Sequence, residues 1–177
     1  MKSDTKSMGG AHTKLVRICL ESKLLREIFF PLVISLLIFG ATWVKVPFYP
    51  VPFTLQTFAI PLLCFFCSRK HMLEGLLLFT AYRILQSGMG LLLTSGYIFG
   101  FFPMVYILTP GERNIFKWTM KMIVAEFLVL FFGMAVLAAF VGLNQAFRSG
   151  FLFFIPAEIL KFTVILGLFK LLNLSKK

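Results

Sequence analysis

Two ionisable residues, Glu158 and Lys161, interrupt a long apolar stretch near the C-terminus. They are three residues apart, which places both side chains on one face of a helix. A carboxylate and an ammonium at this spacing suit a ligand that carries both N–H donors and a negative charge. The same residues could form a structural ion pair, or the lysine could extend to the membrane surface. Ionisable groups inside a bilayer are costly and usually mark a substrate path, so we favour a ligand site.

Other polar residues lie at the ends of apolar segments, and each has two interpretations. Arg83 could anchor its segment at the membrane interface or contact an anionic ligand. Gln56 could satisfy the backbone beside a proline-rich stretch or line a site. Thr94, Ser95 and Tyr97 begin another segment, where the tyrosine could belong to an interfacial aromatic belt or to a pocket wall.

Residues for catalysis or metal binding are sparse. The deep carboxylates Glu126 and Glu158 are far apart in the sequence. Cys64 and Cys67 form a CxxC pattern followed by His71, but a structural zinc site usually takes four ligands and a redox CxxC needs a different fold context. Packed thiols are the simpler interpretation. We therefore expect neither an enzyme nor a chain that binds a metal or cofactor of its own.

The composition identifies the elements that position these residues. Of 177 residues, 59% are hydrophobic and 14% are charged, and the mean hydropathy is +0.90. Soluble domains average about 45–50% apolar and about 25% charged residues. The sequence therefore predicts an integral membrane protein, with length for five or six spans of about 20 residues each. No room remains for a nucleotide-binding domain, so any driving ATPase must be another chain.

Six apolar segments predict an all-α polytopic fold with six transmembrane helices. We expect a basic tail over 1–27, a membrane domain over 28–172 and a basic C-terminus over 173–177. The segments from the second to the fourth are short, and irregular backbone that lines a cavity can extend such spans. The proline-rich stretch 47–52 and the stretch 88–90 suit this role. The six segments are 28–44, 54–67, 72–86, 94–108, 118–143 and 153–172.

The net charge of +11 could indicate nucleic-acid binding, but its distribution indicates membrane orientation. With six spans, 14 of the 18 lysines and arginines lie on the side of the two termini. Basic residues accumulate on the cytoplasmic side. We therefore expect cytoplasmic termini, a multi-pass protein of the cell (inner) membrane surrounded by lipid, and no nucleic-acid partner.

Three stretches form recognisable signatures when taken together. They are residues 40–57, GATWVKVPFYPVPFTLQT, residues 88–101, GMGLLLTSGYIFGF, and residues 155–161, IPAEILK. The three resemble signatures of the BioY family, which supplies biotin-binding S components of energy-coupling factor transporters. The three occur in the family's order, and the resemblance extends over about residues 30–172.

This resemblance implies a six-helix S component with an outward-facing cavity for biotin. Glu158 stands at the family's aspartate, Lys161 at its lysine, and Gln56 in its TLQT segment. Tyr97 and the turn 94–96 would line the pocket. The implied partners are a transmembrane coupling subunit and two cytoplasmic ATPase subunits, which would use the ATP.

Two alternatives remain open at this point. Ala157–Glu158 replaces the family's Gly-Asp pair, and the loop before the fourth segment is shorter, so the ligand could be another small vitamin. The chain could also be a membrane scaffold without a transport role. An enzyme ranks below both because acid–base groups are lacking.

Overall fold

The computed structural model of the chain describes residues 23–47, 49–86, 89–108, 112 and 114–174. These residues are almost entirely helical, as the apolar segments predict. The helices are α2 (Lys23–Trp43), α3 (Gln56–Phe66), α4 (Arg69–Leu85), α5 (Met89–Ile107), α6 (Ile115–Val141), α7 (Leu143–Phe147), the π-helix η1 (Arg148–Leu152) and α8 (Phe154–Leu174). The strands β1 (Lys45–Val46) and β2 (Phe53–Thr54) form a short antiparallel pair between α2 and α3.

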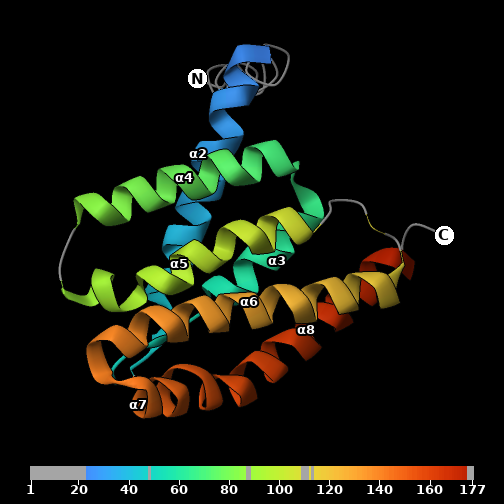
Figure 1. Cartoon of the computed structure of the whole chain (residues 1–177). Helices are drawn as coiled ribbons and strands as arrows, with labels where there is room; N and C mark the ends of the chain where they lie inside the picture. The colour runs from blue at the N-terminus through green and yellow to red at the C-terminus, as the bar shows by residue number, and fades with distance from the viewer. Residues whose placement is uncertain (1–22, 48, 87–88, 109–111, 113, 175–177) are drawn as a thin grey trace, which may run out of the picture.

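The longer helices form one packed bundle. In Figure 1, α4, α5, α6 and α8 run across the view one below another, and α2 passes behind α4 at a steep angle. The end of α5, the start of α6 and the end of α8 lie together at one end of the bundle, whereas α6 turns into α7 at the other end. This alternation brings the start of α6, which carries Lys117, and the end of α8, which carries Lys170, to the same end of the bundle.

Three stretches are long and apolar enough to cross a membrane, namely Leu25–Trp43, Ile115–Val141 and the combined Leu143–Leu171. Two shorter apolar helices, Gln56–Phe66 and Leu92–Ile107, lie among them. At 1.5 Å per residue, the 11 residues of α3 extend about 17 Å, roughly half of a bilayer's hydrocarbon thickness. The all-α membrane architecture is therefore confirmed, while the count of six spans and their orientation stay predictions.

The two stretches expected to be irregular differ from each other. Prolines keep 47–52 out of helix, and β1 pairs with β2 around this loop, with Val46 opposite Phe53. The stretch 88–90 does not remain irregular, because α5 already begins at Met89. No proline follows Gly90, so nothing there removes a backbone donor and the helix can begin earlier. Gly88 lies outside the described residues.

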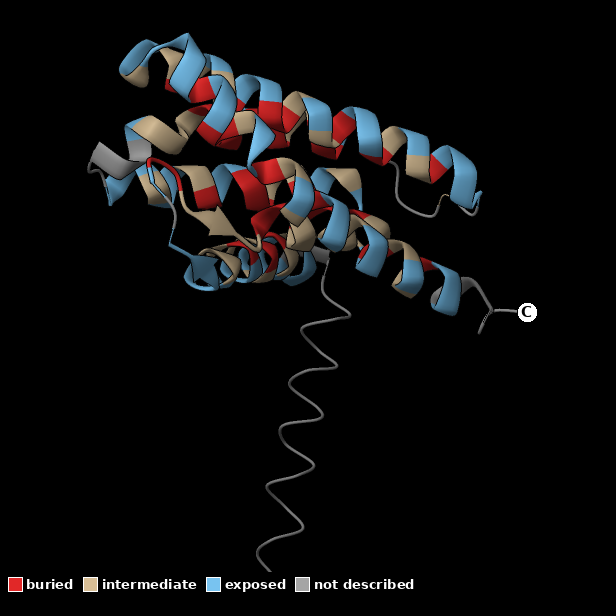
Figure 2. Ribbon diagram, turned by 90° about the horizontal axis from the view of Figure 1, so that it is seen from below, coloured by how far each residue is buried: buried red, intermediate tan, exposed pale blue. Residues whose placement is uncertain are grey.

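Burial separates the interior of the bundle from an apolar exterior. Buried residues face one another between the helices, and the outward faces are exposed (Figure 2). Phe79, Met104 and Trp118 are almost fully buried, whereas Phe29 and Phe127 are more than half exposed. Large exposed apolar side chains on outward faces are what contact with lipid requires, since water would disfavour so much apolar surface.

Glycines bring α5 and α6 close together. A side chain at Gly100 would place its Cβ atom 2.6 Å from the Cα atom of Val129, which no real contact permits. Gly96, one turn earlier, lies equally close to α6. Gly96 and Gly100 thus form a small-xxx-small contact with α6, and this contact fixes where α5 places its polar residues.

The connection from α6 to α8 was not predicted. Gly142 adopts φ +81°, a left-handed conformation that favours glycine and ends α6. The chain then forms α7 and the π-helix, a rare structure often found at functional sites. Tyr97 Oη donates a hydrogen bond to the Gly150 carbonyl oxygen at 2.7 Å, so α5 holds the π-helix in place.

Candidate ligand-binding site

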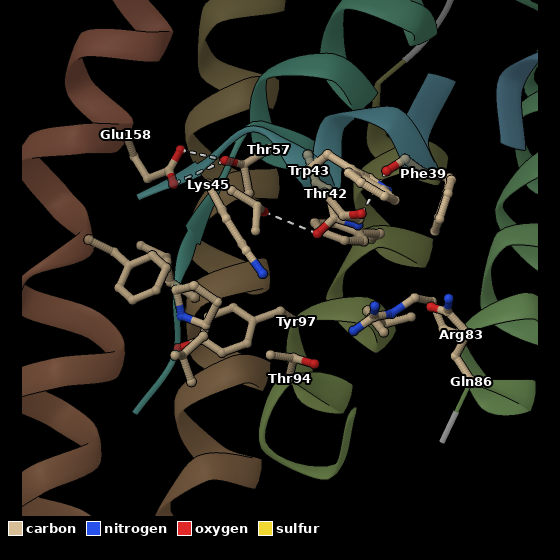
Figure 3. A pocket seen from close by; sticks show the side chains of 18 residues that line it. Phe39, Thr42, Trp43, Lys45, Thr57, Arg83, Gln86, Thr94, Tyr97 and Glu158 are labelled. Atoms are coloured by element: carbon tan, nitrogen blue, oxygen red, sulfur yellow. Dashed lines mark hydrogen bonds between the residues drawn. The ribbon is translucent and has the colours of Figure 1, made fainter. Parts of the chain in front are cut away.

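A cavity of about 340 Å³ lies between the β1–β2 hairpin and the surrounding helices. This volume is in the lower part of the range of about 300–1,000 Å³ for small-molecule pockets. Side chains from α2, α3, α4, α5, α6 and α8 reach it (Figure 3). Its lining residues are Phe39, Thr42, Trp43, Lys45, Val51, Pro52, Thr54, Gln56, Thr57, Arg83, Gln86, Thr94, Tyr97, Ile98, Phe101, Leu130, Phe154 and Glu158.

One wall of the cavity contains a buried ion pair. Lys161 Nζ donates to Glu158 Oε1 at 2.8 Å, and Thr57 Oγ1 donates to Glu158 Oε2 at 2.8 Å (Figure 3 shows Glu158 and Thr57). Pro156 lies in the first turn of α8, and Glu158 follows two residues later, near the start of that helix. The predicted shared face of Glu158 and Lys161 is confirmed.

Lys161 does not itself line the cavity. Its ammonium also donates to the Thr54 carbonyl oxygen and to Thr57 Oγ1, each at 2.8 Å, so all three of its protons have acceptors. Its side chain is only 14% exposed. In this state Lys161 orients Glu158 and binds the β2–α3 turn, and Glu158 is the member of the pair that faces the cavity.

Gln56 lies in the same wall, at the start of α3. Its Oε1 atom accepts a hydrogen bond from Thr54 Oγ1 at 3.0 Å, and the side chain is buried at the cavity. The β1–β2 hairpin leads directly into α3, and Lys161 of α8 bonds to Thr54 in β2, so Thr54 and Gln56 lie next to the α8 ion pair. The structure thus places Gln56 in the cavity wall, and the partner of its Oε1 atom is the Thr54 hydroxyl rather than the backbone.

The wall formed by α4 carries cationic and amide side chains. Arg83 and Gln86 lie across the cavity from Glu158, and Lys45 extends between the two sides (Figure 3). The Arg83 cation therefore lies at the end of the cavity opposite the Glu158–Lys161 pair, and the Lys45 ammonium lies between them.

Aromatic rings form the body of the cavity. Tyr97 and Phe154 stack with centroids 5.5 Å apart and planes 19° apart, and both line the cavity. Tyr97 is therefore a wall residue rather than part of an outer aromatic belt. Thr94 also lines the cavity, whereas Ser95 does not; its hydroxyl donates to the Leu92 carbonyl oxygen at 2.8 Å. Positions 94 and 97 are three residues apart and share one face of α5, whereas position 95 points away from that face, which explains the difference.

The sequence profile of the BioY family matches residues 12–176. The chain belongs to the BioY family. It is similar to a protein of Thermotoga maritima named biotin transporter BioY, with 28% identity over 144 residues that cover 73% of this chain and 85% of the relative. It is also similar to a protein of Rickettsia prowazekii named probable biotin transporter BioY, with 27% identity over 155 residues, 79% of this chain and 80% of the relative. No solved structure matches the chain.

Sequence reasoning about this BioY-family chain missed Lys45, Thr57 and Gln86 as cavity residues, together with most of its apolar lining. A signal for Lys45 was present in the charge distribution. Four basic residues break the bias toward one side of the membrane, namely Lys45, Arg83, Arg148 and Lys161. Lys45 and Arg83 line the cavity and Lys161 lies behind its wall, so three of these four exceptions mark the site, whereas Arg148 is exposed on the π-helix.

The CxxC pattern and His71 do not form one site in this BioY-family chain. Cys64 is buried and both described cysteines are free thiols. His71 stacks on Phe30 at 5.4 Å, and its Nε2 atom lies 3.9 Å from Glu27 Oε1. His71 therefore joins α4 to the start of α2 and has its own partners away from the cysteines.

Proposed function

We propose that this chain is the biotin-binding membrane subunit of an uptake transporter. The observation that carries the proposal is the closed polar network of Glu158, Lys161 and Thr57 at one end of an aromatic cavity whose other end carries the Arg83 cation. Family membership and the names of the two relatives support biotin as the ligand.

Biotin has three chemical parts that this cavity can receive. The two N–H groups of its ureido ring would donate to Glu158, whose carboxylate Lys161 orients. Its apolar ring would lie against Tyr97 and Phe154. Its carboxylate would approach Arg83, which lies on the far side of the cavity, and Lys45, which extends between the two sides (Figure 3). The arrangement contains binding groups and no acid–base pair poised on a reacting atom, which favours a transporter over an enzyme.

The remaining parts of the machine would come from other chains. We propose that the chain is an S component that works with a transmembrane coupling subunit and two cytoplasmic ATPase subunits, and that ATP is used by those ATPases. The chain would bind no cofactor of its own and no nucleic acid. It would span the cell (inner) membrane six times with both termini in the cytoplasm, as the bias of its basic residues favours.

Isothermal titration of the detergent-solubilised protein with biotin tests the ligand. We expect saturable binding at one site per chain. Glu158→Gln should weaken it by about 10- to 100-fold, the loss of one charge-assisted hydrogen bond, and combined apolar replacement of Glu158 and Lys161 should abolish it. Glu112→Gln, which alters an exposed pair with Lys121 away from the cavity, is the matched control. Unchanged affinity in Glu158→Gln would refute the site.

Biotin amide distinguishes the two ends of the cavity. It keeps the ureido ring and lacks the negative charge, so Arg83→Gln and Lys45→Gln should weaken biotin and leave biotin amide unaffected. If well-folded protein binds no biotin, a panel of other small vitamins separates a changed ligand from a scaffold that binds none. The replacement of the family's Gly-Asp by Ala157–Glu158 is the observation that keeps another vitamin as the second candidate.

A further inference from the structure

A second carboxylate lies beneath the cavity without any hydrogen-bond partner. Both oxygens of Glu126, on α6, are buried, and neither has a partner among the described residues. Leu130, one turn further along the same face of α6, lines the cavity. Glu126 therefore lies about one helical turn below the cavity lining, inside the protein rather than toward lipid.

Glu126 is near the buried ion pair in space, although it is far from it in the sequence. Its charge interacts with those of Glu158 and Lys161, because α8 packs against α6 at this level. The region therefore holds two carboxylates and one ammonium. The ammonium already donates its three protons to Glu158 Oε1, Thr57 Oγ1 and the Thr54 carbonyl oxygen.

Other elements packed on α6 direct their polar groups elsewhere. On α5, Tyr97 donates to Gly150 and Tyr106 lies under the Arg69 guanidinium. On the π-helix, Arg148 is exposed. On α6 itself, Lys121 pairs with Glu112. Among the described residues, the charges that act on Glu126 are thus those of Glu158 and Lys161.

A buried, ionised carboxylate with no hydrogen bond is strongly unfavourable, and a second negative charge beside Glu158 adds repulsion. Proton uptake removes both costs. If the Glu158–Lys161 pair separates, however, the buried ammonium needs a new counter-ion, and Glu126 is the carboxylate within electrostatic reach of it.

We propose that Glu126 is a proton-binding reserve counter-ion for Lys161: it is a neutral carboxylic acid while Lys161 pairs with Glu158, and it becomes a carboxylate when a ligand draws Glu158 away. The proton leaves the Glu126 carboxyl group for bulk water through the cavity, so the net charge around Lys161 remains balanced. Glu126 is then a positioning residue. It neutralises the buried Lys161 ammonium while Glu158 binds the ligand. The part that concerns ligand binding rests on the proposed function.

Infrared spectroscopy of the solubilised, ligand-free protein tests the proton site independently of any ligand. We expect a carbonyl band of a protonated carboxylic acid that is lost in Glu126→Gln and retained in Glu112→Gln. In Glu158→Gln the band should disappear, because Glu126 ionises to neutralise Lys161. In Glu158→Gln combined with Lys161→Met it should return. A band that is absent from the unaltered protein, or that persists in Glu158→Gln, overturns the proposal.

Titration with biotin in buffers of different ionisation enthalpy tests the link to the ligand. We expect the unaltered protein to release up to one proton per biotin bound, and Glu126→Gln to release less by that same amount. Equal proton release by the two proteins overturns the link. If biotin does not bind at all, the proposed function fails, and the infrared result alone decides whether Glu126 is a reserve counter-ion.

Discussion

Removing Lys161 alone from the Glu158–Lys161 pair should be far more damaging than removing both partners. The relative exposures of the two side chains are 7% and 14%, so each charge depends on the other rather than on water. Removing one partner of a buried pair costs about 3–5 kcal/mol, because the other charge is left uncompensated. Lys161→Met should therefore destabilise the protein by about this amount. Glu158→Met combined with Lys161→Met should recover most of the loss, since methionine keeps the volume and the Thr57 hydroxyl can turn to a backbone carbonyl oxygen.

Thermal unfolding in detergent at a fixed scan rate measures this difference. For a chain of this size, 1 kcal/mol corresponds to a shift in Tm of about 2–4 °C. Lys161→Met should thus lower Tm by about 6–20 °C, and the double variant by much less. Lys121→Met is the matched control, because Lys121 and Glu112 form a 3.3 Å pair whose side chains are 34% and 23% exposed. Such surface pairs contribute about 0–1 kcal/mol. Equal Tm values for Lys161→Met and Lys121→Met would refute the conclusion that the Glu158–Lys161 pair is shielded from water.

Three further outcomes follow from the packing and the loops. Gly100→Ala should destabilise the protein by about 1–3 kcal/mol, measured as Tm, because its Cβ atom meets α6 backbone; Gly40→Ala, with nothing within 4 Å, should not. Tyr97→Phe should lower Tm through the lost bond to the π-helix but keep biotin affinity, because the ring wall remains. The pKa of Glu112 is lowered, first by the hydrogen bond from Lys121 and then by a backbone N–H. Glu112 therefore stabilises the folded protein fully above the ordinary carboxyl pKa, and this stabilisation is lost as the pH falls through the lowered pKa. An NMR titration should show a higher Glu112 pKa in Lys121→Met than in the unaltered protein. An unchanged Glu112 pKa would contradict the hydrogen bond from Lys121 as the main cause of the shift.

The membrane fold and the central ion pair followed from the sequence because their signals are local. Apolar runs predict helices, and the spacing of Glu158 and Lys161 predicts a shared face. The helix bounds differ from the predicted segments. α2 begins at Lys23 and α8 ends at Leu174, beyond the apolar segments 28–44 and 153–172, because helical hydrogen bonding continues into polar residues. The π-helix after Gly142 had no local signal, since its position depends on the hydrogen bond from Tyr97 in another helix.

Cavity residues could be predicted where the signal lies within one sequence segment. They could not be predicted where their position depends on how several helices pack together. Glu158, Gln56, Arg83, Thr94 and Tyr97 line the cavity, as a binding role would require. Whether they bind ligand stays a prediction. Lys161 lies behind the cavity wall and Ser95 lies outside it. Both positions depend on how each helix is rotated about its axis relative to its neighbours, which a single sequence does not show.

The nearness of Glu126 to the ion pair was likewise invisible in the sequence. Glu126 and Glu158 are separated by the rest of α6, by α7 and by the π-helix, and only the packing of α6 against α8 brings their charges into contact. Contacts of this kind depend on tertiary structure rather than on residue type or spacing.

The shortness of α3 also sets how far a bound molecule would still have to travel. Gln56 and Thr57 place the cavity at the first turn of α3, and the helix then extends only about 17 Å to Phe66. A ligand held there has the length of one short helix, rather than about 30 Å of hydrocarbon, between it and the far end of α3.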